Sequence, residues 1–155
     1  MNVRWAYIAG FLDGDGSLML QVKRRKDGAL KRRFMCTICF YQDTRHEAPL
    51  RWIQETLGIG YLSRRRDGMT ELRVNGYEQV ARIMKLLLPF LRFKKRQAQA
   101  MYRAAKLLMR VNRRRLTPRQ LTVLVELILV IQAENYVTRK KRTRPELLRM
   151  FGLTP

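Results

Sequence analysis

The segment that most constrains the fold is WAYIAGFLDGDG, residues 5–16, in which apolar and small residues lead directly into two acidic ones. The apolar part predicts a helix over residues 6–12, with Gly14 and Gly16 as its breakers. A helix C-terminus carries a partial negative charge, so a carboxylate there costs up to about 1 kcal/mol. A bound cation is the simplest partner that would offset this cost.

Two glycines of the same segment, Gly10 and Gly14, lie four positions apart and therefore on one face of a helix. Small residues at this spacing let a second backbone approach closely, as is best known from membrane helices. The sequence thus predicts a helix that packs tightly against a partner helix and directs its last carboxylate, Asp15, at a metal ion.

The 155-residue chain carries 33 Lys and Arg against 12 Asp and Glu, a formal net charge of +21. Such a surplus repels itself in an isolated protein and indicates a polyanionic partner, first nucleic acid and second a membrane surface. The most apolar run, residues 121–131, is too short to span a bilayer and contains Glu126. Because no signal-peptide pattern opens the chain, we expect an intracellular protein of unknown compartment and no membrane partner.

The two cysteines, Cys36 and Cys39, form a C-x-x-C pattern that is typical of zinc and redox sites. A zinc site needs four ligands, and the chain has a single histidine, His46. The surrounding residues read as a strand, in which positions three apart face opposite sides. We therefore interpret both cysteines as small strand residues.

Two basic hairpins are predicted. Residues 17–26 alternate in hydropathy and residues 30–41 return after the turn signal Asp27-Gly28, while residues 60–66 and 69–75 flank Asp67-Gly68. The residues expected to face the core are Leu18, Leu20, Val22, Phe34, Cys36, Ile38 and Phe40. Those expected to face outward are Met19, Gln21, Lys23, Arg25, Lys31, Arg33, Met35, Thr37 and Cys39.

Helices are predicted around the hairpins. They cover residues 49–57 with Gly58 as the stop, 77–90 closed by Pro89, 95–111, 119–133 and 145–150. A basic linker at 112–118 and a basic run at 138–144 separate the last three helices.

Paired side by side, the hairpins would form a four-stranded antiparallel sheet with one polar, positive face. Strands of about ten residues span about 33 Å, which is close to one turn of B-DNA. A β-ribbon fits the major groove, and Gln21, Arg25 and Arg33 are side chains of the kinds that read adenine and guanine. The simpler alternative is a solvated strand face, but acidic residues are nearly absent from both hairpins.

These residues carry a family resemblance. Residues 8–16, IAGFLDGDG, resemble the nine-residue motif of the LAGLIDADG homing endonucleases. The likeness continues through Gln42-Asp43-Thr44, through LGIGY at 57–61, and through LPFL at 88–91 with Lys94, Lys95 and Gln97. It covers about residues 5–110 in order and spacing.

The resemblance implies an α+β fold of order αββαββα, with a four-stranded antiparallel DNA-binding saddle and extra C-terminal helices. We expect a single domain over 1–155, with a core at about 5–110 and a helical extension at about 111–155. One copy of the motif implies a homodimer, because cutting both DNA strands requires two sites. The residues that would form the dimer interface are Ala9, Gly10, Asp13 and Gly14.

The resemblance also implies a site for phosphodiester hydrolysis with Mg²⁺, which Mn²⁺ is expected to replace. Asp15 and the carbonyl of Gly14 would bind the metal, and Asp15, Gln42 and Lys94 would be catalytic. Asp13 would tether the helix end, and His46 would play a weak supporting role. The residues implied to contact DNA are Gln21, Lys23, Arg25, Lys31, Arg33, Met35, Cys39, Ser63, Arg65, Glu71 and Arg73.

The predicted function is therefore a site-specific endonuclease that cuts a long pseudo-palindromic DNA target and promotes mobility of its host intron. Two alternatives remain open: an RNA maturase that aids splicing of that intron, and a DNA-binding regulator that does not cleave. Asp15, Gln42 and Lys94 are all present, which favours cleavage. If intron RNA is also a partner, the basic segments 92–115 and 139–144 are its candidate surfaces.

Overall fold

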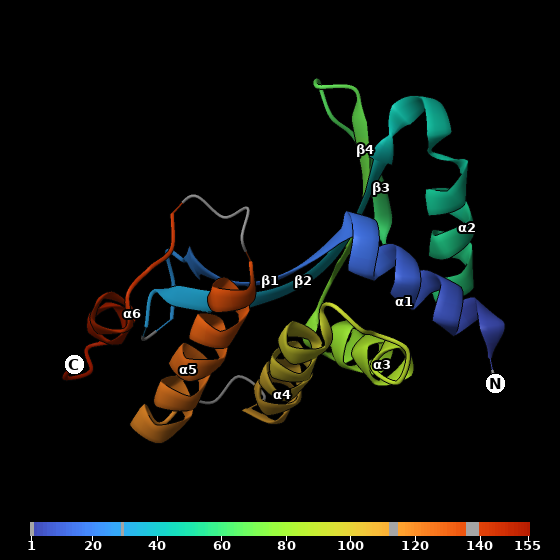
Figure 1. Cartoon of the computed structure of the whole chain (residues 1–155). Helices are drawn as coiled ribbons and strands as arrows, with labels where there is room; N and C mark the ends of the chain where they lie inside the picture. The colour runs from blue at the N-terminus through green and yellow to red at the C-terminus, as the bar shows by residue number, and fades with distance from the viewer. Residues whose placement is uncertain (1, 29, 112–114, 136–139) are drawn as a thin grey trace.

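The computed structural model describes residues 2–28, 30–111, 115–135 and 140–155 (Figure 1). The elements, in chain order, are α1 (Val3–Asp15), β1 (Gly16–Arg24), β2 (Arg32–Asp43), a 3-10 turn η1 (Thr44–His46), α2 (Ala48–Leu57), β3 (Tyr61–Arg64), β4 (Met69–Asn75), α3 (Tyr77–Leu87), α4 (Lys95–Val111), α5 (Pro118–Glu134) and α6 (Arg144–Met150). The predicted α+β class and the αββαββα order with further C-terminal helices are confirmed.

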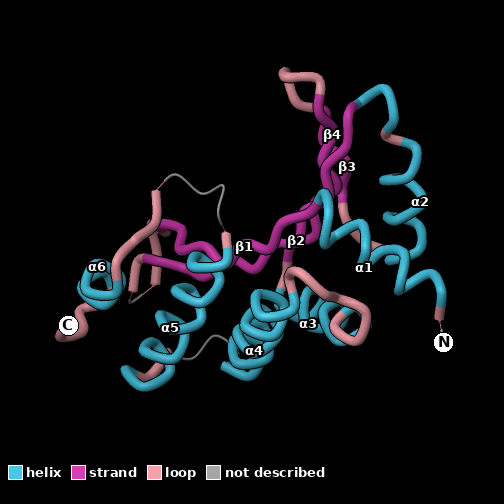
Figure 2. The backbone as a smooth tube through the Cα atoms, in the orientation of Figure 1, coloured by secondary structure: helices cyan, strands magenta, loops and turns pink. Residues whose placement is uncertain are grey.

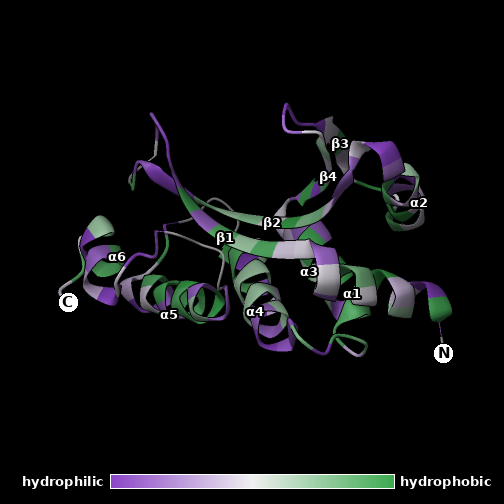
Figure 3. Cartoon of the chain, turned by 45° about the horizontal axis from the view of Figure 1, so that its top comes forward, coloured by the Kyte–Doolittle hydropathy of each residue, from purple (hydrophilic) through white to green (hydrophobic). Residues whose placement is uncertain are grey.

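The two hairpins form one four-stranded antiparallel sheet in the order β1-β2-β4-β3. The hairpins join through β2 and β4, where Gln42 pairs with Thr70 and Cys39 with Arg73. The helices cover one side of the sheet, and the opposite side is concave and uncovered (Figures 1 and 2). Hydrophilic residues dominate both hairpin tips (Figure 3). The predicted saddle is therefore present.

The core lies between the sheet and the helices. The even-numbered residues Leu18, Phe34, Ile38 and Phe40 are buried, as the alternation predicted. The predicted outward exposure of Thr37 and Cys39 is wrong, because both side chains are fully buried. Strand β2 is interior to the sheet, so longer neighbours cover its small residues, and the Thr37 hydroxyl donates to Asn75 Oδ1 at 2.7 Å.

The motif helix is longer than predicted, because α1 continues through Gly14 and ends at Asp15. Gly14 is thus not a breaker, whereas Gly16 marks the change from helix to strand. A Cβ on Gly16 would lie 2.8 Å from the Leu12 carbonyl oxygen and 2.9 Å from Leu12 Cα. Only glycine permits the strand to leave the helix this closely, so the motif's last residue is fixed by packing.

Other boundaries shift by a few residues. Helix α3 ends at Leu87 rather than at residue 90. The loop of the first hairpin is longer than a two-residue turn: β1 ends at Arg24 and β2 begins at Arg32, and the Arg25 N–H donates to the Lys31 carbonyl at 2.8 Å. Strand β3 is shorter than predicted. The predicted linker at 112–118 and basic run at 138–144 lie partly outside the described residues.

The C-terminal helices pack onto the first hairpin. The rings of Phe34 and Phe151 stack at 5.1 Å, and Arg32 Nε donates to the Met150 carbonyl at 3.2 Å. The extension therefore contributes to the core of the sheet, while the predicted single domain over 1–155 stays a prediction. Among the described residues, no helix has both the length and the hydropathy required to cross a bilayer.

A nearly buried carboxylate joins α2 to the second hairpin. The Glu47 side chain, 11% exposed, accepts hydrogen bonds from Arg51 at 3.0 Å, Arg64 at 2.6 Å and the Thr70 hydroxyl at 2.8 Å. The Arg64 guanidinium, followed by the Thr70 hydroxyl, lowers the pKa of Glu47 to about 2 from its ordinary 4.5. Because Thr70 pairs with Gln42, this cluster also supports the end of β2.

We expect Glu47→Gln to lower the free energy of unfolding at neutral pH. A carboxyl with a lowered folded-state pKa stabilises the protein above its unfolded pKa, and this contribution is lost as the pH falls from about 4.5 to about 2. The stability gap between wild type and variant should therefore narrow over that range in urea titrations. Glu55→Gln, at an exposed position within α2, is the control, and an equal, pH-independent gap for both variants would contradict the assignment.

Candidate active site and DNA-binding face

Asp13 ties the C-terminal end of α1 to the loop before α4. Its Oδ2 accepts the Arg92 N–H at 2.7 Å, and its Oδ1 accepts the Lys94 N–H at 2.9 Å. In return, Lys94 Nζ donates to the Asp13 carbonyl at 2.6 Å. These three hydrogen bonds bring the amine of Lys94 to the end of the helix that carries Asp15.

The electrostatics of this helix end are unbalanced. Asp15 is exposed, and its carboxylate has no hydrogen-bond or ion-pair partner among the described residues. Burial lowers the pKa of the Lys94 amine, while the charges of Asp13 and Asp15 act in the opposite direction. Two carboxylates at a negative helix end with one lysine leave net negative charge, which favours binding of a cation.

The chain supplies only part of a metal site. Nowhere in the described part of the chain do three His, Cys, Asp or Glu side chains gather closely enough to hold an ion. Asp15 and the Gly14 carbonyl are hard oxygen donors, and Mg²⁺ commonly takes one or two carboxylates and completes its shell with water and substrate phosphates. The residues present therefore fit a divalent ion whose remaining ligands come from outside the chain.

Gln42 lies at the same end of the sheet as the acidic helix end. Gly16, the first residue of β1, pairs with Phe40 of β2. Gln42 therefore lies two residues past this pair, at the end of the sheet where α1 leads into β1. Its Oε1 accepts the Asp43 N–H at 2.9 Å, which leaves the amide N–H groups of Gln42 available. His46 is exposed in the η1 turn, and no hydrogen bond joins it to Gln42 among the described residues.

The predicted DNA contacts fall into two zones of the concave face. At the tip of the first hairpin, the exposed cations Lys23, Lys31 and Arg33 have no ion-pair partner among the described residues, and Arg25 pairs with Asp27 at 3.2 Å. Lys23 lies opposite Arg33, and the half-buried Gln21 lies opposite Met35.

The inner zone is an ordered polar row across the sheet. Ser17, Cys39, Arg73 and Tyr61 occupy one register row across all four strands. In the next row Glu71 lies opposite Ser63, and Glu71 accepts from Arg73 at 3.0 Å. Arg65, near the second hairpin tip, pairs with Asp67 at 2.7 Å. The cations of this zone are therefore already oriented by acidic neighbours.

Two predicted site residues are wrong. Cys39 cannot contact DNA through its side chain, because it is fully buried beneath its cross-strand neighbours, and burial raises the pKa of its thiol. Ala9 cannot belong to a dimer interface, because it is fully buried within the chain itself. Larger cross-strand neighbours close over the small Cys39, which the strand period does not reveal, whereas Ala9 lies on the side of α1 that Ile8 and Leu12 bury.

Sequence reasoning missed Ser17 and Tyr41. The Ser17 and Tyr41 hydroxyls lie 2.9 Å apart on the concave face, immediately after the acidic helix end and immediately before Gln42. Burial raises the pKa of Tyr41, so its hydroxyl stays neutral. The same alternation that placed Gln21 on this face also places Ser17 there.

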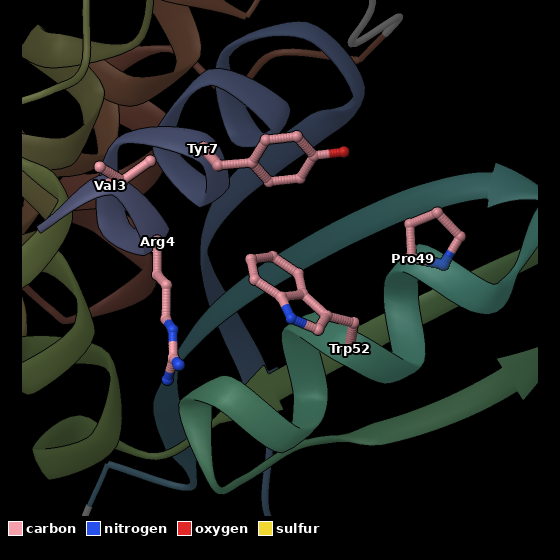
Figure 4. A pocket seen from close by; sticks show the side chains of 5 residues that line it. All are labelled: Val3, Arg4, Tyr7, Pro49 and Trp52. Atoms are coloured by element: carbon pink, nitrogen blue, oxygen red, sulfur yellow. The ribbon is translucent and has the colours of Figure 1, made fainter.

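The outward face of α1 is apolar and largely exposed to solvent in the described chain. Val3 is 72% exposed, Tyr7 is 54% exposed, and Gly10 and Gly14 continue the same line with open space around each. Tyr7 meets Trp52 of α2 edge-to-face at 5.3 Å. Together with Arg4 and Pro49, these side chains line a hollow of about 400 Å³ (Figure 4).

The family model described as LAGLIDADG endonuclease matches residues 8–105, more than half of the chain. The chain belongs to this family. The match includes the whole motif helix from Ile8, both hairpins, and most of α4. The three predicted catalytic residues, Asp15, Gln42 and Lys94, all lie within the matched residues.

Two curated relatives are named as DNA endonucleases. Over 143 aligned residues the chain is 32% identical to I-CvuI of Chlorella vulgaris. The aligned residues make up 92% of this chain and 84% of I-CvuI. Over 92 aligned residues it is 30% identical to I-CreI of Chlamydomonas reinhardtii. These residues make up 59% of this chain and 56% of I-CreI.

Solved structures of homing endonucleases share this fold. I-CvuI in complex with its target in the presence of Ca matches with a TM-score of 0.84 at 26% identity, over 99% of the chain and 97% of that chain. A second structure holds I-CvuI with the I-CreI target in the presence of Mg, and its DNA is not cleaved. It matches with a TM-score of 0.76 at 31% identity, over 99% of this chain and 97% of the I-CvuI chain.

Proposed function

We propose that two copies of this chain bind one long pseudo-palindromic DNA target and hydrolyse one phosphodiester in each strand with Mg²⁺, which promotes mobility of the host intron. The observation that carries this proposal is the end of α1. There an unpaired Asp15 carboxylate lies beside Lys94, at the edge of a concave basic sheet. Mn²⁺ should replace Mg²⁺, because carboxylate and carbonyl oxygens bind both ions.

Each residue of the site has a distinct part in this chemistry. Asp15 and the Gly14 carbonyl would hold the metal, which would supply Lewis-acid polarisation of a phosphoryl oxygen and a lowered pKa of bound water. Lys94 donates to the oxygen on which negative charge develops, in the manner of other preorganised donors. The free amide N–H groups of Gln42 orient the attacking water, and Asp13 positions Lys94 through the loop.

The outward face of α1 supports a dimer. Gly10 and Gly14 let two copies of the helix approach, and the exposed Val3 and Tyr7 extend the contact. Phe93 is 84% exposed and lies between Arg92 and Lys94, whose backbone N–H groups both donate to the Asp13 carboxylate. It therefore lies close to the same helix end. A two-fold axis through this face places both copies of Asp15 beneath the DNA.

The function is tested on a duplex library with a randomised target segment, because the natural target is unknown. We expect cleavage of a small set of related sequences with Mg²⁺ and none with a chelator present. Binding without cleavage at any divalent metal would instead favour the non-cleaving regulator. The maturase alternative and intron RNA as a partner stay predictions.

Arg33→Ala should relax discrimination at one base pair of each half-site by about 1–3 kcal/mol, if the guanidinium reads a base edge. Arg33 is suited to this part because it is exposed and unpaired among the described residues. The measurement is the cleavage profile of the selected target with each base pair varied in turn. Arg119→Ala, which removes an exposed arginine of α5 on the helical side of the sheet, is the control. A uniform loss across all sequences would show that Arg33 contacts only phosphate.

A further inference from the structure

Phe93 is an apolar ring exposed to water in the loop between α3 and α4. At 84% it is the most exposed large apolar side chain among the described residues. The loop itself is held, because the Arg92 and Lys94 N–H groups donate to the Asp13 carboxylate at 2.7 and 2.9 Å. A ring that projects from a fixed backbone is suited to bury itself against a partner surface, where aromatic residues are enriched.

A hollow of matching character lies between α1 and α2. It has a volume of about 400 Å³ and is lined by Val3, Arg4, Tyr7, Pro49 and Trp52 (Figure 4). Tyr7 and Trp52 meet edge-to-face at 5.3 Å and form its aromatic wall. An inserted phenyl ring would be packed against these two rings. The guanidinium of Arg4 is a further favourable neighbour for the face of such a ring.

The loop and the hollow lie on opposite flanks of the stripe formed by Gly10 and Gly14. Successive residues of a helix are turned by about 100° from one another. From the middle of the stripe, Asp13 lies about 80° around α1 in one direction and Arg4 about 100° in the other. Asp13 holds the loop that carries Phe93, and Arg4 lines the hollow.

A two-fold axis brings these two flanks together. Both copies of α1 must direct their C-terminal ends at one duplex, so the helices run in the same direction and the axis lies along them. Half a turn about this axis exchanges the flanks, and the loop of one copy then faces the hollow of the other. Asp13 and Tyr7 are about 9 Å apart along α1. Phe93 of one copy and the Tyr7–Trp52 pair of the other project into that interval.

We propose that Phe93 of each copy inserts into the α1–α2 hollow of the other copy, so that two reciprocal contacts flank the paired motif helices. These contacts rest on the homodimer proposed above and add to it residues outside the motif. Because Phe93 directly precedes Lys94, the hollow of the partner also holds the loop that carries this amine. Phe93 is therefore a positioning residue for Lys94, and each active site depends on a contact across the dimer.

Two single variants each remove one half of this contact. Phe93→Ala deletes the ring, and Trp52→Gln replaces the wall of the hollow with a polar side chain that suits a helix. Each should raise the dimer dissociation constant, measured by sedimentation equilibrium without DNA, by at least about a hundredfold. Truncating an aromatic anchor often costs tenfold or more, and the dimer contains two such anchors.

Three further variants control for other effects. Phe93→Leu should keep most of the dimer affinity, because leucine still fills part of the hollow. Met109→Ala removes an exposed apolar side chain of α4 and should dimerise as the wild type does. Circular dichroism checks that each chain folds. Should Trp52→Gln lose helix content, Val3→Gln takes its place, because Val3 lines the same hollow and is 72% exposed.

Mixing the two variants distinguishes a direct contact from two unrelated effects. In a heterodimer of the Phe93→Ala chain and the Trp52→Gln chain, an intact ring meets an intact hollow once, whereas neither homodimer keeps a complete contact. The mixture should therefore dimerise at least about tenfold more tightly than either variant alone. On a plasmid saturated with this heterodimer, nicked DNA should accumulate, because only one of its two Lys94 loops is held.

A mixture that dimerises no more tightly than either variant alone would overturn the proposal, because ring and hollow would then not meet. Equal rates of cutting on both strands by the heterodimer would contradict the positioning of Lys94 by Phe93. Wild-type dimerisation by both single variants would show that the hollow has no part in assembly. The nuclease proposal would survive each of these results, because it is tested by cleavage of the selected target with Mg²⁺.

Discussion

Replacing Asp15 by Asn should abolish DNA cleavage while the fold and DNA binding persist. The exchange removes the unpaired carboxylate at the end of α1 and keeps its shape, so no hydrogen bond within the described chain is lost. Loss of a metal-holding charge is worth several kcal/mol of barrier, and about 4 kcal/mol corresponds to a roughly thousandfold slower single-turnover rate. DNA affinity should be unchanged or higher, because one negative charge near the phosphates disappears.

Single-turnover cleavage and anisotropy binding on the selected target separate these two effects. Glu78→Gln, an exposed acid at the start of α3, is the control for a change of net charge and should cleave normally. Cleavage by Asp15→Asn at the wild-type rate would show that the metal is held elsewhere. A parallel loss of binding and thermal stability would mean that the exchange had damaged the fold, and Asp15→Ser would then be compared.

Replacing Gly10 by Leu should separate assembly from folding. A Cβ on Gly10 meets no atom within 4 Å, so the single chain accommodates a side chain there. Glycine inside a helix costs about 0.5–1 kcal/mol relative to alanine, and the variant chain should therefore fold at least as stably as the wild type. The leucine would nevertheless hold two copies of α1 apart, so we expect a monomer that no longer cuts both DNA strands.

Sedimentation, thermal unfolding and cleavage of a supercoiled plasmid carrying the target measure these three outcomes. Ala133→Leu provides the matched control, because it places the same side chain at an exposed small residue of a different helix, α5. A Gly10→Leu variant that remains dimeric and fully active would place the interface on another surface.

Local sequence pattern predicted much of this molecule. The alternation of apolar and polar residues in β1 and β2 determined which side of each strand is buried, because a sheet reverses side-chain direction at every residue. The Asp-Gly pairs identified both hairpins. The motif helix, with Gly10 and Gly14 on one face and carboxylates at its end, indicated a close partner and a cation before any fold was known.

What the sequence left open depends on residues that are far apart in the chain. Cys39 has the alternation expected for the outward side of β2, but larger neighbours from other strands cover it. Ala9 follows the side of α1 that carries the buried Ile8 and Leu12, although it directly precedes the exposed Gly10. Lys94 reaches the acidic helix end only because Asp13, 81 residues earlier, accepts the N–H groups of the loop that carries it. The hollow between α1 and α2 likewise exists only once the two helices pack together.

The motif segment shows both contributions at once. Its sequence alone determined a helix with small residues on one face and unbalanced carboxylates at its end, because helical periodicity and the helix dipole act locally. The tertiary structure decided how those carboxylates differ. The loop before α4 occupies both oxygens of Asp13, whereas Asp15 stays exposed without a partner among the described residues. That difference arises from packing between distant segments, and it leaves Asp15 as the carboxylate free to hold a metal.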